Sequence, residues 1–205
     1  TGSVATIGHG LGSAPNFVII KCRSETRSWV VTNTNLGFTG RAFLDTTDAW
    51  SVNSGEFNDT APTSSVFTVG GDFRTNRSGQ TYVAYLFKNI KGFSKTGTYT
   101  GNGSTDGTFV YTGFKPAFIL AKSTGATTWE MVDNKRLGYN SSNWSLFPNT
   151  TAAENADTVR LDILSNGFKI RTTGSNLNTS GQAYIYMAFA ENPLVSSTGV
   201  PATAR

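Results

Sequence analysis

The feature that most constrains this chain of 205 residues is that it repeats itself at a spacing of 100 to 102 residues. The clearest match joins residues 78–87 to 180–189, which share Ser-Gly-Gln, a tyrosine two residues later and a final phenylalanine. Other matches keep the same order: Pro15, Phe17, Lys21, Trp29 and Phe67 recur as Pro116, Phe118, Lys122, Trp129 and Phe168. We therefore interpret the chain as two copies of one unit, residues 1–99 and 100–205.

Both copies open on Thr-Gly, at Thr1 and at Thr100. From this shared opening we expect the fragment to be cut at a junction between repeats, with further chain upstream in the parent protein. The intact mass of the native gene product would test this expectation.

The composition and patterning predict β-structure. Glycine is abundant at 22 residues and charged residues make up only 15%, a balance that favours short strands and polar turns. Short apolar runs, many of them β-branched or aromatic, predict strands at 17–22, 29–32, 66–69, 82–87, 107–111, 118–122, 129–132, 160–164, 167–172 and 184–189. Two of these runs, 82–87 and 184–189, are apolar at every position and predict central strands buried on both faces.

The expected fold class is all-β, with two tandem β-sandwich (jelly-roll-like) units related by internal duplication and no helix longer than two turns. Asn166-Gly167 predicts a hairpin turn, because both residues tolerate positive φ. The glycine-rich residues 101–107 are interpreted as a linker between the copies.

The charges and the single cysteine exclude several classes. The net charge is +4 and its basic residues are dispersed, so we expect no nucleic-acid partner. Cys22 cannot form an intrachain disulfide and is expected in a partly buried strand. No apolar run reaches the roughly 18 residues of a membrane span, and we expect no membrane insertion.

Catalytic chemistry has few candidate residues. The only histidine is His9, and Thr112 stands at the matching place in the second copy. One histidine and one cysteine cannot build a structural zinc site, and no phosphate loop is present. Two carboxylate pairs, Glu130 with Asp133 and Asp45 with Asp48, fit the needs of a glycosidase, but solvated strand-edge charges explain them equally well. We expect no enzyme activity, no metal and no cofactor.

The aromatic residues separate into two groups. Those that recur, Trp29 with Trp129 and Tyr82 with Tyr184, are expected in the cores. Aromatics that do not recur beside Asn and Ser amides are typical of sugar sites, where rings stack on pyranose C–H groups and amides bind hydroxyls. The candidate ligand-binding residues are Trp50, Tyr139, Asn140 and Trp144. A subunit interface or simple core filling would use the same residues.

Five motifs resemble an uncharacterised domain family of phage tail and tail-fibre proteins, abundant in marine phages. They lie at 8–15 (Gly-His-Gly-Leu-Gly-Ser-Ala-Pro), 92–103, 109–116, 165–169 and 184–193. The resemblance spans almost the whole chain and implies a virion location, extracellular when mature, with a structural or host-binding role. It supplies no catalytic or binding residues.

The function expected from the resemblance and the aromatics is host-surface adhesion, with a glycan as ligand and other virion proteins or copies of the chain as partners. A homo-oligomer is expected, and a trimer is one common form in fibres. Two alternatives stay open: a purely structural filament, head-fibre or capsid-decoration module, and a polysaccharide depolymerase.

Overall fold

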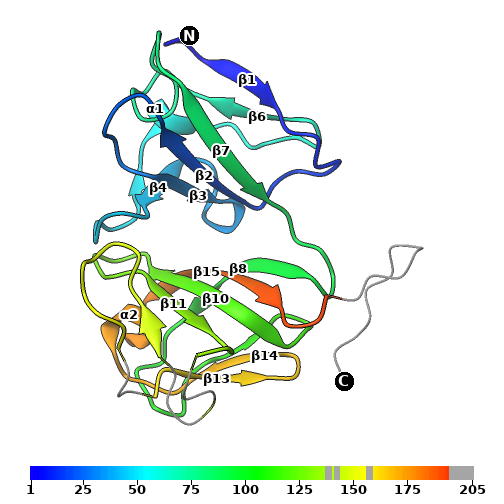
Figure 1. Cartoon of the computed structure of the whole chain (residues 1–205), viewed down its shortest axis with the longest axis vertical. Coiled ribbons are helices and arrows are strands. Elements are labelled where there is room, and N and C mark those ends of the chain that lie inside the picture. Colours follow the sequence, from blue (N-terminus) through cyan, green and yellow to red (C-terminus); the bar gives the residue numbers. More distant parts are fainter. Residues whose placement is uncertain (137–139, 141–143, 156–158, 194–205) are drawn as a thin grey trace. The chain divides into compact units, whose positions relative to one another are not determined.

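A computed structural model describes residues 1–136, 140, 144–155 and 159–193. The chain is all-β, as predicted, and divides into two compact units, Thr1–Lys88 and Asn89–Arg205. Its described α-helices are two single turns of four residues, α1 and α2 (Figure 1). No helix in the described part of the chain is long and apolar enough to cross a membrane.

The first unit is a sandwich of two antiparallel sheets. The larger sheet has the order β5-β4-β3-β2-β7, and the smaller pairs β1 with β6. Apolar residues from both sheets and from the single turn α1 pack between them, among them Val18, Phe57 and Phe67. The bounds are β1 Ala5–Gly8, β2 Phe17–Cys22, β3 Val30–Asn33, η1 Thr34–Leu36, β4 Gly40–Phe43, β5 Ser51–Val52, α1 Ser54–Phe57, β6 Val66–Val69 and β7 Tyr82–Phe87.

The second unit has the same plan with more strands. Its larger sheet has the order β12-β11-β10-β15-β8, and its smaller sheet the order β13-β14-β9 (Figure 1). The core between the sheets includes Tyr99, Ile119, Phe168 and Tyr184. The bounds are β8 Ser94–Thr100, β9 Phe109–Tyr111, β10 Pro116–Ser123, β11 Glu130–Asp133, β12 Ser145–Leu146, β13 Leu161–Leu164, β14 Gly167–Ile170, α2 Ser175–Asn178 and β15 Ala183–Ala190.

Residues matched by the sequence repeat make the same internal contacts in each unit. The Tyr82 hydroxyl donates to the Phe73 carbonyl and accepts from the Arg77 amide. The Tyr184 hydroxyl likewise donates to Ser175 and accepts from Thr179. In the larger sheets, the order β4-β3-β2-β7 corresponds to β12-β11-β10-β15. These matches are what an internal duplication predicts, and duplication remains our interpretation of them.

The boundary between the units lies earlier than the 99/100 expected from the repeat. Strand β8 pairs with β15 along its whole length, so residues 89–99 belong to the second unit. Residues 101–107 also differ from expectation, because they are a loop of the second unit. Within this loop, the Gly103 amide donates to the Asn178 carbonyl, and the Asn178 side chain donates to the Ser104 carbonyl.

The two runs predicted as central strands have different positions. Strand β15 lies between β10 and β8, and Tyr184–Ala188 of it are buried, as predicted. Strand β7 pairs only with β2 among the described residues, and is therefore an edge strand. The prediction for 82–87 was wrong, and Tyr85 in this strand is 46% exposed.

The hairpin between β13 and β14 is confirmed, but its turn residues are Ser165 and Asn166, because Leu164 pairs with Gly167, the first residue of β14. The reason for the glycine differs from the one expected, since neither Asn166 nor Gly167 has positive φ. A Cβ on Gly167 would lie 2.1 Å from the Val110 carbonyl oxygen of the adjacent strand β9. Close approach of two backbones therefore requires this glycine.

Gly167→Ala is expected to destabilise the second unit by about 1–3 kcal/mol, because β14 must move away from β9. Chemical denaturation would measure the loss. Gly8→Ala is the matched control, since Gly8 also lies in a strand and a Cβ there would meet its nearest atom, the Ser65 carbonyl oxygen, at 3.9 Å. Equal stabilities of the two variants would contradict the close-approach explanation.

Candidate functional site

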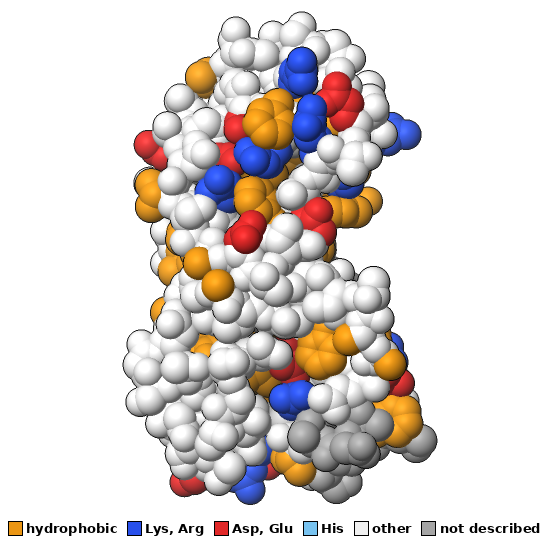
Figure 2. Space-filling view, turned by 90° about the vertical axis from the view of Figure 1, so that its left-hand side faces the viewer, with side chains coloured by type: hydrophobic (Ala, Val, Ile, Leu, Met, Phe, Trp, Pro, Cys, Tyr) orange, Lys and Arg blue, Asp and Glu red, His pale blue; other side chains and the backbone are white. Residues whose placement is uncertain are grey.

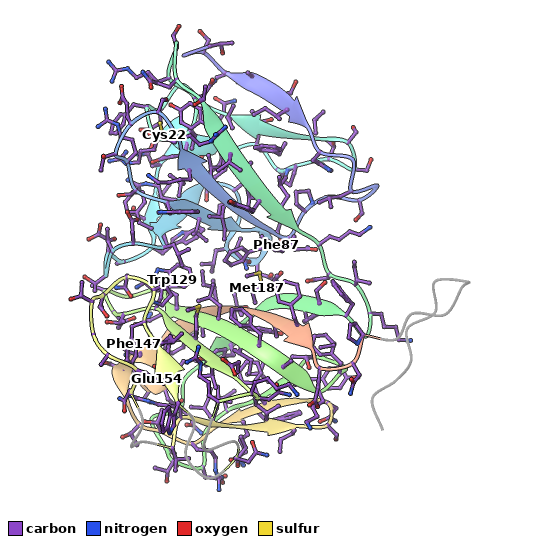
Figure 3. All side chains as sticks on the ribbon, in the orientation of Figure 1. Cys22, Phe87, Trp129, Phe147, Glu154 and Met187 are labelled. Atoms are coloured by element: carbon purple, nitrogen blue, oxygen red, sulfur yellow. The ribbon has the colours of Figure 1, made fainter. Side chains whose placement is uncertain are left out.

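An open groove of about 740 Å³ is formed entirely by residues of the first unit. It lies along the end of β2, the turn that follows it, and the start of β7. Cys22 marks this end of the sheet, and Phe87 lies at the opposite end of β7 (Figure 3). The residues that line the groove are Lys21, Cys22, Arg23, Ser24, Glu25, Thr26, Trp29, Tyr82, Val83 and Tyr85.

Strand alternation explains why polar and aromatic side chains share the groove. Val18 and Ile20 of β2 point into the core, together with the Ala84 side chain of β7. Successive side chains of a strand point to opposite faces, so Lys21 and Tyr85 lie on the other face of the same sheet. On this second face Lys21, Val83 and Tyr85 line the groove, whereas Phe17 and Ile19 of the same face are buried.

Two aromatic rings form a flat surface in the groove. The rings of Trp29 and Tyr85 are stacked, with centroids 6.4 Å apart and planes inclined by 20°. The Lys21 ammonium lies 5.9 Å from the centroid of the Trp29 ring and donates to the Arg27 carbonyl. The exposed Tyr85 ring thus offers an apolar face, and a positive charge lies near the ring on which it stacks.

The turn after β2 supplies polar groups at the rim. The Ser24 hydroxyl accepts from the Thr81 amide at 3.0 Å and donates to the Gln80 side chain. The Glu25 carboxylate pairs with Arg27 at 2.5 Å and with Arg77 at 3.8 Å. These contacts hold hydroxyl and carboxylate groups at the mouth of the groove.

Cys22 lines the groove but is only 2% exposed, which confirms the expected buried strand position. Burial alone would raise the pKa of its thiol. Hydrogen bonds from the Ser24 side chain and from the Glu25 and Ser24 backbone outweigh that effect, so the pKa lies below its usual value. Its small exposure leaves the thiol a packing residue of the sheet.

A row of arginine and phenylalanine side chains continues from the groove. The guanidinium of Arg74 lies 4.3 Å from the centroid of the Phe73 ring and 5.2 Å from that of Phe43. The Arg27 guanidinium also lies over the Phe73 ring, and that of Arg41 lies over Phe43. Figure 2 shows cationic side chains interleaved with hydrophobic ones on this face. We call these five residues the arginine–phenylalanine row.

The buried carboxylate of Glu56 pairs with two arginines of this row, Arg41 and Arg74. Glu56 is fully buried in α1 and lies 2.7 Å from the Arg41 Nε and 3.7 Å from Arg74. Burial raises the pKa of Glu56, and the neighbouring Arg41 opposes that rise. The arginines of the row are therefore fixed by internal pairing, Arg41 and Arg74 with Glu56 and Arg27 with Glu25.

The four candidate residues from the sequence do not form this site. The half-buried Trp50 packs over β4, where its Nε1 leaves no room for a Cβ on Gly40. The Asn140 amide donates to the Ile163 carbonyl and accepts from the Ile163 amide, so it continues the edge of β13. Trp144 is half-buried in the second unit, and Tyr139 lies outside the described residues.

Three of the four candidate acids are engaged in structural contacts, and the fourth, Asp48, is exposed. Glu130 is buried against Arg160 at 3.2 Å and accepts from the Ser145 hydroxyl. Asp133 pairs with Arg136, and Asp45 accepts from the Trp29 amide. Within the described ranges, no three His, Cys, Asp or Glu side chains are grouped to hold a metal ion.

Sequence reasoning missed Trp29 and Tyr85 as site residues. Trp29 was expected in the core because it recurs as Trp129. Trp129 is indeed fully buried, but Trp29 is only half-buried and lines the groove. One signal was available: Tyr85 stands where the second copy has Met187, so the aromatic ring at this position is not needed for the shared packing.

Comparison with models of protein families matches residues 1–193 to a domain of unknown function, DUF7483. The match spans both units and nearly the whole chain. Comparison with curated proteins and with solved structures finds no match.

Proposed function

We propose that this chain, which belongs to the DUF7483 family, is a domain of a phage tail fibre or related virion protein that binds a host-surface glycan in the groove of its first unit. One observation carries the proposal: an exposed Tyr85 ring is held flat by stacking on Trp29, and the Lys21 ammonium lies 5.9 Å from the centroid of the Trp29 ring. The virion setting rests on the motif resemblance described above.

The groove has the chemistry that a short saccharide requires. Pyranose C–H groups stack on the faces of aromatic rings, while charged and hydroxyl side chains bind the sugar hydroxyls. Lys21 and Glu25 provide a donor and an acceptor at the same opening. The volume of about 740 Å³ falls within the range of small-ligand sites.

In this proposal the chain binds without catalysis. A groove open to solvent and built on two rings gives modest affinity for one sugar segment. Display of several copies on one virion would convert weak single-site binding into strong attachment, because each later contact forms at high effective concentration. Copies of the chain and other virion proteins are therefore the proposed partners.

A purely structural module is the second candidate, and the second unit supplies an observation in its favour. Strand β9 exposes two aromatic side chains, with Phe109 45% and Tyr111 64% exposed. Exposed apolar side chains that lie together mark surfaces for protein contact. Such a surface suits packing against a neighbouring virion protein, and it is compatible with a glycan site on the first unit.

A glycan array probed with the whole chain tests the proposed function. We expect binding that Tyr85→Ala weakens by about 2–10-fold, the range for loss of one aromatic stacking partner, and that Trp29→Ala combined with Tyr85→Ala abolishes. Trp50→Ala is the control aromatic variant and should bind as the parent does. Binding unchanged by Tyr85→Ala would refute the groove as the glycan site. No glycan bound at all would refute the proposed function and favour the structural module.

The glycans bound on the array can also be used to distinguish binding from depolymerisation. Incubation with the chain is expected to leave the polysaccharide length unchanged. Shortened products would instead revive the depolymerase alternative, and their loss in Glu130→Ala or Asp133→Ala would identify the acid involved.

A further inference from the structure

The second unit provides an internal template for strand β7. In that unit β15 pairs with β10 along one edge and with β8 along the other. In the pairing with β8, Tyr184 lies opposite Tyr99 and Tyr186 opposite Gly97. In the first unit β7 corresponds to β15 and β2 to β10, but no described strand corresponds to β8. At this edge of the larger sheet, the second unit has the strand β8, and the described first unit has no strand.

The backbone of β7 is arranged to accept that strand. The Phe87 and Thr81 carbonyls accept from Asn16 and Arg23 on the β2 side. Backbone groups of an antiparallel strand alternate in direction, so the N–H and C=O groups of Tyr82, Ala84 and Leu86 point to the opposite edge. In the second unit the Gln182 carbonyl on the equivalent side accepts from Gly101, next to β8.

The side chains of the two matched tyrosines also differ, because among the described residues no tyrosine stacks on Tyr82 as Tyr99 stacks on Tyr184. The Tyr184 ring is fully buried and stacks on Tyr99 of β8, with centroids 4.9 Å apart and planes inclined by 9°. Tyr82 is held by the same two hydroxyl bonds as Tyr184, yet it remains partly exposed. A tyrosine on an added strand would stack on it in the same way.

The hydrogen bonds of Thr1 show the direction from which such a strand would arrive. Its nitrogen donates to the Asn76 side-chain oxygen at 2.8 Å, as the Asn102 amide does to Asn178 in the second unit. The next amide, of Gly2, donates to the Asn76 carbonyl, as Gly103 does to Asn178. Thr1 thus occupies the place of Asn102, which is separated from the end of β8 only by Gly101. A residue joined to the Thr1 nitrogen would therefore lie beside the open edge of β7.

We propose that the open edge of β7 receives an antiparallel strand of the β8 type, joined directly ahead of Thr1, with a tyrosine opposite Tyr82. The added strand completes the larger sheet of the first unit in the order β5-β4-β3-β2-β7-added strand.

The packing further specifies one residue of the added strand. In β8 the position opposite Tyr186 is Gly97, where a Cβ would lie 2.9 Å from the tyrosine ring. The first unit has the small Ala84 in place of Tyr186. The space freed by the smaller residue is filled by a side chain larger than glycine on the incoming strand.

Three fusions ahead of Thr1 in the whole chain test the proposal. The first fusion carries a copy of residues 93–101 (Phe-Ser-Lys-Thr-Gly-Thr-Tyr-Thr-Gly). The second carries the same copy with valine in place of the glycine copied from Gly97. The third carries the copy with proline in place of both that glycine and the lysine copied from Lys95. Amide exchange at Tyr82, Ala84 and Leu86 is expected to slow by about tenfold or more in the first two fusions. The proline fusion should not slow it, because proline removes the donors of the added strand.

Two further variants keep the test decisive. Ala84→Pro removes one open-edge amide without touching the bonds to β2, and should cancel the effect of the glycine fusion. Gly97→Val in the second unit should destabilise that unit, although valine at the matched fusion position is tolerated. Unchanged exchange in both non-proline fusions would overturn the proposal. Concentration-dependent protection of these amides in the unfused chain would overturn it as well, because it would assign the edge to a second copy.

Discussion

Tyr184→Ala is expected to lower the stability of the second unit by about 3–5 kcal/mol, the cost of removing a fully buried aromatic ring. Tyr82→Ala should cost the first unit clearly less. The two tyrosines occupy matched positions and make the same hydroxyl bonds, but only Tyr184 is stacked on a neighbouring tyrosine and fully buried. Chemical denaturation, followed by amide exchange in β7 and β15, measures each unit separately.

Phenylalanine variants are the matched controls for this comparison. Tyr82→Phe and Tyr184→Phe each remove a hydroxyl that bridges two backbone groups, and each should cost about 1–3 kcal/mol. Similar losses for the phenylalanine pair, with dissimilar losses for the alanine pair, would locate the difference in the ring environment. Equal losses for Tyr82→Ala and Tyr184→Ala would contradict the description of β7 as an open edge.

The strands were predictable because their signal is local. The apolar runs at 17–22 and 66–69 coincide with β2 and β6, and each run carries its own β-branched and aromatic residues. Turn chemistry was equally local, although the reason for Gly167 was a close backbone neighbour contributed by β9. A contact with a strand far away in the sequence leaves no mark in the residues next to that glycine.

The position of a strand within its sheet was not predictable in this way. Residues 82–87 and 184–189 have the same apolar pattern, yet β7 lies at an edge and β15 in the centre. The difference depends on whether a second segment pairs with the strand, and pairing is decided by residues outside the run. The unit boundary was mispredicted for the same reason. Strand β8 pairs with β15, so the second unit begins at Asn89 and not at Thr100.

The candidate site shows why recurrence was a poor guide to burial. Trp29 and Trp129 recur, and recurrence predicts shared core packing for both. A matched position fixes the direction of a side chain relative to its strand but not what covers it. The sequence therefore did not predict the groove, because Trp29 is expected in the core from its recurrence. Only Tyr85 carried a usable signal, since the repeat has Met187 at the matched position.

Arg160→Met is expected to destabilise the second unit by about 3–5 kcal/mol at neutral pH, the cost of leaving a buried charge without its partner. Glu130 is 1% exposed, and Arg160 lies 3.2 Å from its carboxylate. Burial raises the pKa of Glu130 above its ordinary value even with Arg160 and the Ser145 hydroxyl opposing the rise. Loss of the guanidinium removes one of the opposing contributions and raises the pKa further.

The raised pKa of Glu130 decides how the stability depends on pH. A carboxyl whose pKa is higher in the folded state holds its proton more tightly there than in the unfolded chain. Stability from this group is therefore greatest below the unfolded-state pKa and is lost as the pH rises through the folded-state pKa. Because Arg160→Met raises the folded-state pKa, its destabilisation should be largest at neutral pH and should shrink as the pH falls and Glu130 becomes neutral.

Two variants separate this effect from lost packing. Glu130→Gln added to Arg160→Met removes the unpaired charge, and should recover part of the stability and abolish the shrinkage with falling pH. Arg171→Met breaks a more exposed pair with Asp162 and should cost no more than about 1 kcal/mol. A loss in Arg160→Met that is the same at every pH would show that the guanidinium acts by filling space, and that the charge of Glu130 is not what it stabilises.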